Sequence, residues 1–240
     1  MKTLIGIPTY SKQEYCLEEF TQALKSQKGE YDILFVVNNG ETAYASLIKS
    51  KGFKVKENPE KTDGLKETVL SHRKLLRKHA LDNNYDYLLF LDSDIILPDK
   101  FAIQRLLAAQ KDIITGVYLD VFEIQGQKVS VPFLLREAKG GGQLYTYQAM
   151  FPPRILEVGA CGIACLLVSK KALEKTSFDN NYANEGIGFC IKSKKQGFKI
   201  WADTSVKCIH RAFPRDDKRA KVFEWLTNIE DYTYELKWPD

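Results

Sequence analysis

The sequence predicts a mixed α/β protein built around a mostly parallel sheet. Strand-like apolar runs alternate with segments of helical periodicity over the first half of the chain, a pattern typical of parallel sheets covered by helices. The most apolar run, residues 87–91, contains no charged side chain, so we expect a strand that is buried on both faces. With 240 residues and 44% hydrophobic content, the chain can bury one sizeable core.

The elements of the first half follow from two patterns. Each predicted strand is a short apolar run closed by Pro, Asn, Gly or Asp, and each predicted helix repeats apolar residues every three or four positions. In chain order, we expect a strand at 3–7, a helix at 12–27, a strand at 31–37, a helix at 41–51, an edge strand at 53–55, a helix at 66–81, a strand at 87–91, a helix at 100–109 and a strand at 113–118.

The second half has a different pattern. Residues 121–142 predict hairpins or a loop, and residues 155–169 predict one apolar strand whose glycines allow a close backbone approach. A short helix at 184–196 and strands at 198–201 and 206–209 follow. We therefore expect one α/β domain at 1–210, with a smaller β region in its second half, and a basic, aromatic extension at 211–240 packed on or near it.

Composition limits the function. The net charge of +4 is too small to suggest nucleic-acid binding and is compatible with a small anionic substrate. No apolar stretch has the length of a signal peptide core or a membrane span, so the sequence predicts a cytoplasmic protein with at most peripheral membrane contact. The five scattered cysteines are expected to be buried free thiols rather than zinc ligands.

Two carboxylates follow the buried strand, in the sequence Asp92-Ser93-Asp94. The carboxyl edge of an open α/β sheet is where ligands bind, and neighbouring carboxylates there favour a cation between or beside them. The sequence therefore predicts a divalent metal site that holds a phosphorylated substrate. The alternative is that Asp94 or Asp99 caps the next helix and that Asp92 is merely exposed.

Four segments together resemble the nucleotide-sugar glycosyltransferases of the GT-A fold, in particular the family-2-like group. They are Ile5-Gly6-Ile7-Pro8-Thr9-Tyr10, Val36-Val37-Asn38-Asn39-Gly40, Phe90-Leu91-Asp92-Ser93-Asp94 and the stretch from Asn184 to His210. Each motif is loose on its own, but their order and spacing together make the match specific. The resemblance covers nearly the whole chain up to Arg211.

The resemblance implies a metal-dependent transfer of a sugar from a nucleoside-diphosphate donor to a hydroxyl acceptor, such as a glycan, a lipid or a protein-linked sugar. Asp92, Asp94 and His210 would hold Mn²⁺ or Mg²⁺, with manganese favoured by the imidazole; a surface histidine beside Arg211 is the alternative for His210. The implied donor-binding residues are Pro8, Thr9, Tyr10, Asn38, Asn39, Arg73, Asp92 and Ser93. A solvated basic helix face is the alternative for Arg73, and a plain Asn-Gly turn for Asn38-Asn39.

The chain departs from the family pattern at the catalytic base. Inverting members carry an acidic pair on the helix near Glu185, but Gly186 stands where the second acid would be. Glu185 as base is the hypothesis we favour; retention without a dedicated base, or lost catalysis, are the alternatives. On the acceptor side, the resemblance implicates Gly159, Ala160, Cys161 and Gly162.

Two rival functions remain after the sequence is considered. A nucleotidyltransferase shares the nucleotide-binding sheet and the metal, but usually begins with a Gly-rich basic loop, which Ile7-Pro8-Thr9-Tyr10 does not provide. A non-catalytic nucleotide- or glycan-binding module is favoured by Gly186 and opposed by Asp92, Asp94 and His210. The sequence does not identify the donor base, the sugar or the acceptor.

Overall fold

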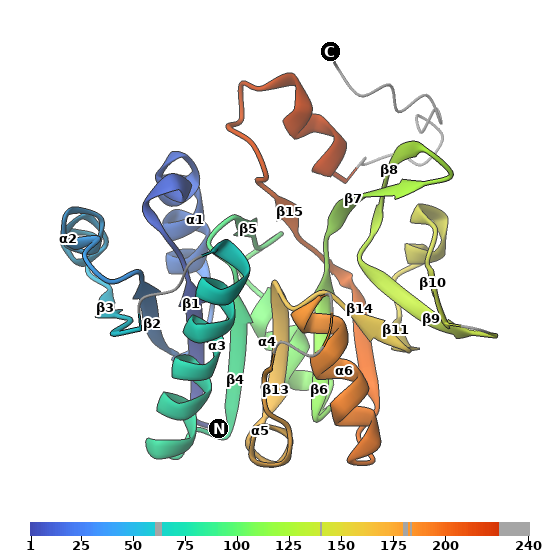
Figure 1. Ribbon diagram of the computed structural model, residues 1–240, viewed down its shortest axis with the longest axis horizontal. Coiled ribbons are helices and arrows are strands. Elements are labelled where there is room, and N and C mark those ends of the chain that lie inside the picture. Colours follow the sequence, from blue (N-terminus) through green and yellow to red (C-terminus); the bar gives the residue numbers. More distant parts are fainter. Residues whose placement is uncertain (61–63, 140, 180–181, 183, 226–240) are drawn as a thin grey trace.

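The computed structural model describes residues 1–60, 64–139, 141–179, 182 and 184–225. Its centre is a mixed sheet of eight strands, six of which run in the same direction (Figure 1). The two reversed strands are β13, between β4 and β6, and β11 at one edge. Across the sheet the strands are β11 (Ile155–Val158), β14 (Ile200–Lys207), β6 (Ile113–Val117), β13 (Cys165–Ser169), β4 (Tyr87–Leu91), β1 (Thr3–Pro8), β2 (Asp32–Val37) and β3 (Lys54–Glu57). The predicted fold class is confirmed.

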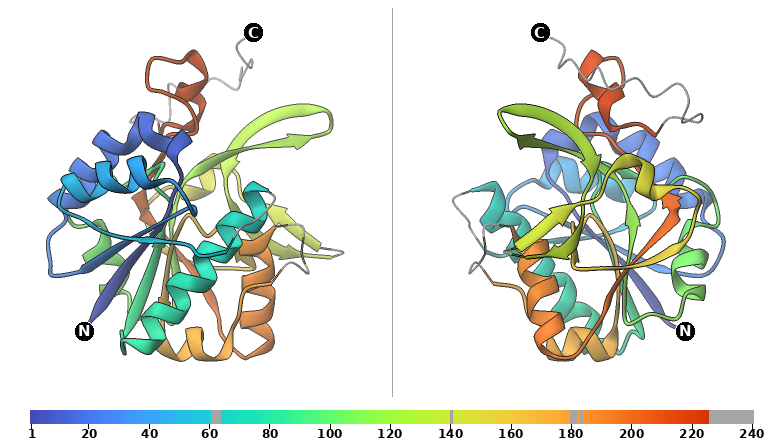
Figure 2. Two further views of the ribbon diagram at one scale, coloured as in Figure 1. Left: turned by 60° about the vertical axis from the view of Figure 1, so that its left-hand side comes forward. Right: turned by 90° about the vertical axis from the view of Figure 1, so that its right-hand side faces the viewer.

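Helices cover both faces of this sheet. One face packs against α1 (Glu14–Ser26), α2 (Thr42–Ser50) and α4 (Ala102–Ala108). The opposite face packs against α3 (Leu65–Asp82), α5 (Lys170–Lys175) and α6 (Glu185–Lys195). Figure 1 shows α3, α5 and α6 side by side in front of the strands, and Figure 2 shows the same layers from two other sides.

Strand β4 lies at the centre of both cores. Leu88 and Phe90 belong to the cluster under α3, whereas Leu89 and Leu91 belong to the cluster under α1 and α4. All four side chains are fully buried. The expectation that this strand is covered on both faces is therefore confirmed, and the residues that follow it leave the sheet at a ligand-binding edge.

Two sequence-based expectations for the second half are wrong. Residues 155–169 do not form one strand: β11 and β13 join the main sheet, and β12 (Ala160–Cys161) joins a separate three-stranded sheet, with Gly159 and Gly162 beside β12 where the chain changes direction. Conversely, residues 198–201 and 206–209 are not two separate strands: β14 runs from Ile200 to Lys207 with a shift in register between Asp203 and Lys207, and Ile209 belongs to the short strand β15. Such an irregularity bends a strand without ending it.

Small sheets extend the carboxyl edge. β7 (Leu119–Ile124) and β8 (Gln127–Pro132) form a hairpin, which projects from the domain in Figure 2. β9 (Leu134–Ala138) lies between β10 (Gly141–Leu144) and β12. The pair β5 (Ile95–Ile96) and β15 (Ile209–His210) matters most, because it brings His210 opposite Ile95, the residue after Asp94.

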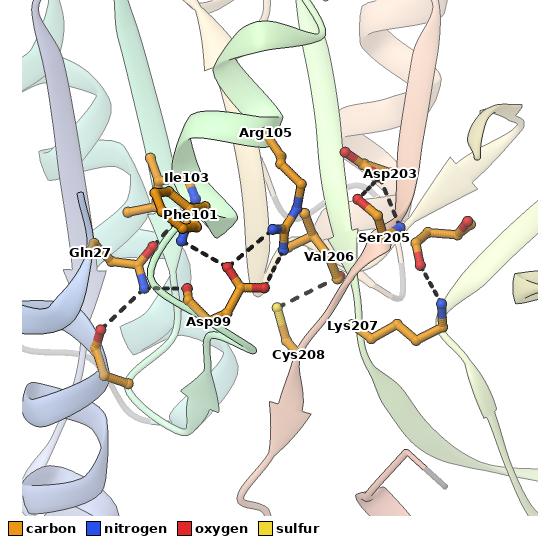
Figure 3. A network of polar contacts seen from close by, with 12 residues as sticks. Gln27, Asp99, Phe101, Ile103, Arg105, Asp203, Ser205, Val206, Lys207 and Cys208 are labelled. Carbon is orange, nitrogen blue, oxygen red and sulfur yellow. Dashed lines mark hydrogen bonds and ion pairs between the residues drawn. The ribbon is translucent and has the colours of Figure 1, made fainter. Parts of the chain in front are cut away.

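Hydrogen bonds to Asp99 stabilise the loop after the Asp-Ser-Asp turn (Figure 3). Its carboxylate accepts hydrogen bonds from the backbone N–H of Phe101, at 2.8 Å, and from the guanidinium of Arg105, at 3.1 and 2.7 Å. The side chain of Gln27 donates to its carbonyl at 2.8 Å, which ties the loop to the end of α1. Asp99 therefore holds the loop before α4, but the N-cap residue of this helix is Phe101 and no side chain caps it, so neither Asp94 nor Asp99 is the cap.

The described part of the extension, residues 211–225, packs on the same domain. Arg211 is 3% exposed and forms an ion pair with Glu19 at 2.9 Å, while Trp225 donates to the carbonyl of Cys208 at 2.8 Å. The segment includes a short 3-10 helix, η3 (Lys218–Phe223), which Figure 1 shows beyond β15. Residues 226–240 of the predicted extension lie outside the described residues. Within the described chain, no helix is long and apolar enough to cross a membrane.

Candidate active site

The Asp92-Ser93-Asp94 turn lies where β4 leaves the sheet, beside the end of β1. The N–H of Asp92 donates to the carbonyl of Ala164 at 2.9 Å, and the N–H of Ile95 donates back to the carbonyl of Asp92 at 3.0 Å. The backbone N–H of Arg211 donates to the carbonyl of Asp94 at 2.7 Å. The turn is thus held by neighbouring strands, so its carboxylates are fixed in position before any ligand binds.

Asp94 faces His210 across the β5–β15 pair. The His210 Nε2 atom lies 3.8 Å from Asp94 Oδ2, and His210 Nδ1 lies 3.1 Å from the carbonyl oxygen of Leu119. Burial by itself would lower the pKa of His210, but the nearby negative charges of Asp94 and Asp120 outweigh it and raise the pKa to about 9. Because the Leu119 carbonyl can accept the proton of Nδ1, Nε2 is the nitrogen that faces Asp94.

The Asp94–His210 pair fits a divalent ion. Ligand atoms about 2.1 Å from one ion lie roughly 3 Å apart when adjacent and roughly 4 Å apart when opposite, and the observed 3.8 Å falls within this span. Among the described residues, no group of three or more His, Cys, Asp or Glu side chains is arranged to hold an ion, so donor oxygens or water would complete the coordination.

Asp92 is held by a buried arginine rather than facing Asp94. Arg73 is 2% exposed; its Nη2 donates to Asp92 Oδ2 at 3.0 Å and its Nε donates to Glu185 Oε1 at 2.6 Å. Burial raises the pKa of Asp92. The positive charge of Arg73 opposes this rise, and the negative charge of Asp94 adds to it. Asp92 Oδ1 lies 3.0 Å from Arg73 Nη2 in the same ion pair, whereas Glu185 Oε2 stays buried without a hydrogen bond from the described residues and is left as an acceptor atom for a ligand.

Two hollows meet at this turn, and both include Asp92 and Asp94. The first, which we call the Tyr10 hollow, measures about 220 Å³ and is lined by Pro8, Thr9, Tyr10, Gln13, Leu65, Thr68, Val69, His72, Asp92 and Asp94. The second, which we call the His210 cavity, measures about 180 Å³ and is lined by Arg73, Asp92, Asp94, Tyr118, Asp120, Phe133, Gly162, Ile163, Ala164, Asn184, Glu185 and His210. The turn therefore separates a mostly uncharged hollow from a strongly charged cavity.

Ser93 does not face either hollow. Its side chain is fully buried, and its hydroxyl lies 2.8 Å from Thr9 Oγ1 and 2.5 Å from Gln13 Oε1. Gln13 in turn donates to Asp94 Oδ2 at 2.8 Å. Ser93 was expected to contact the donor; instead its hydroxyl ties the turn to the loop after β1, because a side chain between two outward carboxylates points inward.

Other predicted residues lie at the edge but outside the hollows. Asn38 follows β2 and donates to Glu41 at 3.3 Å, and Asn39 donates to the carbonyl of Pro59 at 3.4 Å. Neither lines the Tyr10 hollow. On the acceptor side, Ala160 and Cys161 pair with β9, and Gly159 donates to the carbonyl of Leu135 at 2.7 Å. Of the predicted acceptor-side residues, only Gly162 lines the His210 cavity.

Two glycines are required by close packing at the cavity. A Cβ atom on Gly162 would lie 1.8 Å from the Tyr118 hydroxyl, so no larger residue fits without moving that ring. A Cβ on Gly186 would lie 3.1 Å from the carbonyl oxygen of Cys161 and 3.2 Å from the amide of Ile163. The helix therefore packs closely on the backbone where the family's second acid would stand, and a side chain there would need the backbone to shift.

Sequence reasoning missed two titratable residues of the site. Asp120 lies on β7 and lines the His210 cavity; burial raises its pKa, and one oxygen accepts from the N–H of Val121 at 2.8 Å. His72 lies on α3 and lines the Tyr10 hollow. Asp120 followed a predicted strand, which was a usable signal, whereas His72 fitted the apolar face of its helix and gave none.

Comparison with known proteins shows the fold. No protein-family model matches the chain, and no curated protein is significantly similar in sequence. The mannosyltransferase PcManGT from Pyrobaculum calidifontis, in complex with GDP-Man and Mn²⁺, superposes with a TM-score of 0.58 at 12% identity, over 89% of this chain and 57% of that one. The chain has the GT-A fold.

Two further solved structures show the range of the similarity. S. aureus TarS 1–349 in complex with UDP has a TM-score of 0.57 at 16% identity, over 87% of this chain and 59% of that one. A CMP:2-keto-3-deoxy-manno-octonic acid synthetase complexed with CTP has a TM-score of 0.53 at 9% identity, over 84% of this chain and 89% of that one. The chain spans less than two thirds of the two transferases. At these identities the likeness establishes the GT-A architecture.

Proposed function

We propose that this protein is a metal-dependent glycosyltransferase that moves a sugar from a nucleoside-diphosphate donor to a hydroxyl acceptor. The observation that carries the proposal is the facing pair of Asp94 and His210, 3.8 Å apart, at the junction of the two hollows. A donor whose nucleoside occupies the Tyr10 hollow and whose sugar occupies the His210 cavity would place its diphosphate at the pair.

In this proposal Asp94 and His210 hold Mn²⁺ or Mg²⁺, and Asp92, whose two oxygens each lie 3.0 Å from Arg73 Nη2, borders the same region. When bound, the ion offsets the negative charge that develops on the departing nucleoside diphosphate. The ring of Tyr10 stacks on the nucleobase, with Pro8 and Thr9 forming the adjacent wall. Arg73 fixes the orientation of Asp92 and Glu185 through its two charged hydrogen bonds.

Glu185 is the proposed acceptor of the hydroxyl proton. Its Oε1 is occupied by Arg73, while its Oε2 has no hydrogen bond from the described residues, and the residue lines the cavity. Asp120, across the same cavity, is proposed to hold a second hydroxyl of the acceptor through the oxygen that Val121 leaves unbonded.

The test is donor turnover by the purified full chain with a panel of UDP-, GDP-, CDP- and ADP-sugars, with Mn²⁺, with Mg²⁺ and with EDTA. The proposal expects metal-dependent release of one nucleoside diphosphate. Release of pyrophosphate from a nucleoside triphosphate and a sugar acid or sugar phosphate would instead support nucleotidyl transfer, a second candidate favoured only by the structural similarity to the synthetase. Nucleotide binding without any turnover would support the non-catalytic module.

A further inference from the structure

His72 is a buried polar residue with an unused ring nitrogen. The side chain is 1% exposed, and its Nε2 is buried without a hydrogen-bond partner in the described part of the chain. Burying an imidazole nitrogen that has no partner costs free energy, and an apolar residue of similar size would avoid this cost. A histidine that serves only to fill the core is therefore a poor explanation for this position.

The position of His72 suggests what its partner is. Leu65, Thr68, Val69 and His72 form one stripe of α3 that lines the Tyr10 hollow, at the spacing of one helix face. Leu65 is 57% exposed at the entrance, and His72 is the member of the stripe that is nearest in sequence to Arg73, the partner of Asp92. A molecule in the hollow would thus meet His72 close to the carboxylate end.

The charge state of His72 narrows the chemistry further. Burial lowers its pKa to about 4, and the neighbouring charge of Arg73 adds to this effect. At neutral pH the ring is uncharged and makes one directed hydrogen bond, which gives it no strong attraction for a diphosphate. The remaining walls, Pro8, Tyr10 and Val69, suit a planar or apolar surface.

We propose that His72 reads the nucleoside of the donor, its Nε2 making a hydrogen bond to an uncharged group of the base or the ribose. This inference rests on the proposed nucleoside-diphosphate donor and adds a residue that selects among donors. A site built to pair with a particular hydroxyl, amide or carbonyl discriminates against ligands that lack it, because its own buried polar atom is then left unpaired.

The experiment measures binding rather than turnover, by calorimetry with UDP, GDP, CDP and ADP in the presence of Mn²⁺. Wild type is compared with His72→Leu, which removes the hydrogen bond, and with His72→Gln, whose amide reaches the place of Nε2. His79→Leu, on the same helix but outside both hollows, is the matched control. Pyrophosphate with Mn²⁺ serves as a probe of the phosphate end alone.

We expect His72→Leu to weaken the preferred nucleoside diphosphate about 5- to 30-fold, and His72→Gln to remain within about 3-fold of wild type. Pyrophosphate should bind all variants equally. A 2′-deoxynucleotide separates the two forms of the proposal: a loss that vanishes with it assigns the contact to the ribose, and a loss that persists assigns it to the base.

Two results would overturn the inference. Equal affinity of His72→Leu and wild type for every nucleotide that wild type binds would refute the role of His72 while leaving the proposed function intact. Failure of wild type to bind any nucleoside diphosphate would refute both the role of His72 and the proposed function. Should His72→Leu not fold, His72→Asn takes its place, because its shorter amide reaches only the position of Nδ1 and should lose affinity where His72→Gln does not.

Discussion

The Tyr10 hollow and the His210 cavity share two aspartates but differ in nearly everything else. The first is lined by apolar and neutral groups, including Leu65, Val69 and the uncharged His72. The second gathers Arg73, Asp120, Glu185 and His210 around the same carboxylates. A neutral hollow suits the part of a ligand that is recognised, and a charged cavity suits the part whose charge changes during a reaction.

Helix α3 contributes neighbouring residues to both hollows. His72 and Arg73 are consecutive, and on a helix consecutive side chains point about 100° apart. The first therefore lines the neutral hollow, and the second lines the charged cavity. One turn of one helix supplies both the recognition residue and the residue that orients the acids.

The largest expected effect comes from Asp94, which belongs to both hollows. Asp94→Asn removes a charge and a candidate metal ligand while keeping the shape of the side chain. Metal-dependent donor turnover should fall by about 1,000-fold or more, with the unfolding transition little changed. Steady-state assays with Mn²⁺ check this, and Asp82→Asn, on the exposed end of α3, is the control. Turnover at the wild-type level would show that the shared carboxylate is not the functional junction.

Arg73 should matter for stability as much as for activity. Arg73→Met leaves Asp92 and Glu185 in the buried site without their partner. Removing one partner of a buried ion pair typically costs about 3–5 kcal/mol in the free energy of unfolding, which urea denaturation at neutral pH would measure. Lys78→Met, on the exposed face of the same helix, should cost far less. A small loss for Arg73→Met would mean that the two acids are not held as the structure has them.

Glu185 tests the charged cavity alone. Glu185→Gln should lower the rate of sugar transfer by about 100-fold, within the usual range for loss of a general base. Nucleoside-diphosphate affinity should stay close to wild type, because the Tyr10 hollow is untouched. Comparing the rate constant with calorimetric affinity separates the two effects. Full activity would exclude Glu185 as the base and leave Asp120, or a mechanism without a base, to explain transfer.

The smallest effect is a pH dependence from the neutral hollow. Because the folded pKa of His72 is about 4 and the usual value is 6.5, its neutral form stabilises the fold above pH 6.5, and this contribution is lost as the pH falls toward 4. Between pH 7 and pH 5, wild type should lose about 2 kcal/mol more than His72→Gln. Urea unfolding at the two pH values checks this. Parallel losses in both proteins would show that His72 is not buried in its neutral form.

Sequence reasoning predicted the strands of the first half of the chain, although in the sheet β4 lies beside β1 and not beside β3. Strands β1 to β4 came from apolar runs with clear stops, and the central strand was recognised because both of its faces are apolar. The reversed strand β13 was not separable, because residues 155–169 are apolar throughout and their breaks, at Gly159 and Gly162, were read as close approaches.

Sequence reasoning found the candidate site residues that belong to a local motif at the end of a strand. It missed the contacts that depend on how distant elements pack together. Asp92, Asp94 and His210 line the same cavity; strand ends indicated this place for the two aspartates and the resemblance for His210, and their role as metal ligands stays a prediction. The Arg73 bridge to Glu185 joins residues 112 positions apart, so no local pattern could reveal it. Ser93, Asn38 and Asn39 have polar side chains of the right kind, but neighbouring loops bind the Ser93 hydroxyl and the two amide nitrogens.

The most direct test of the account is the affinity of the wild-type protein for a panel of nucleoside diphosphates, titrated once with Mn²⁺ and once with EDTA. If the aspartate–histidine pair grips a pyrophosphate through a shared ion, at least one diphosphate will bind about 10-fold or more tightly with the metal. Identical affinities in the two titrations, or no binding in either, would contradict the account.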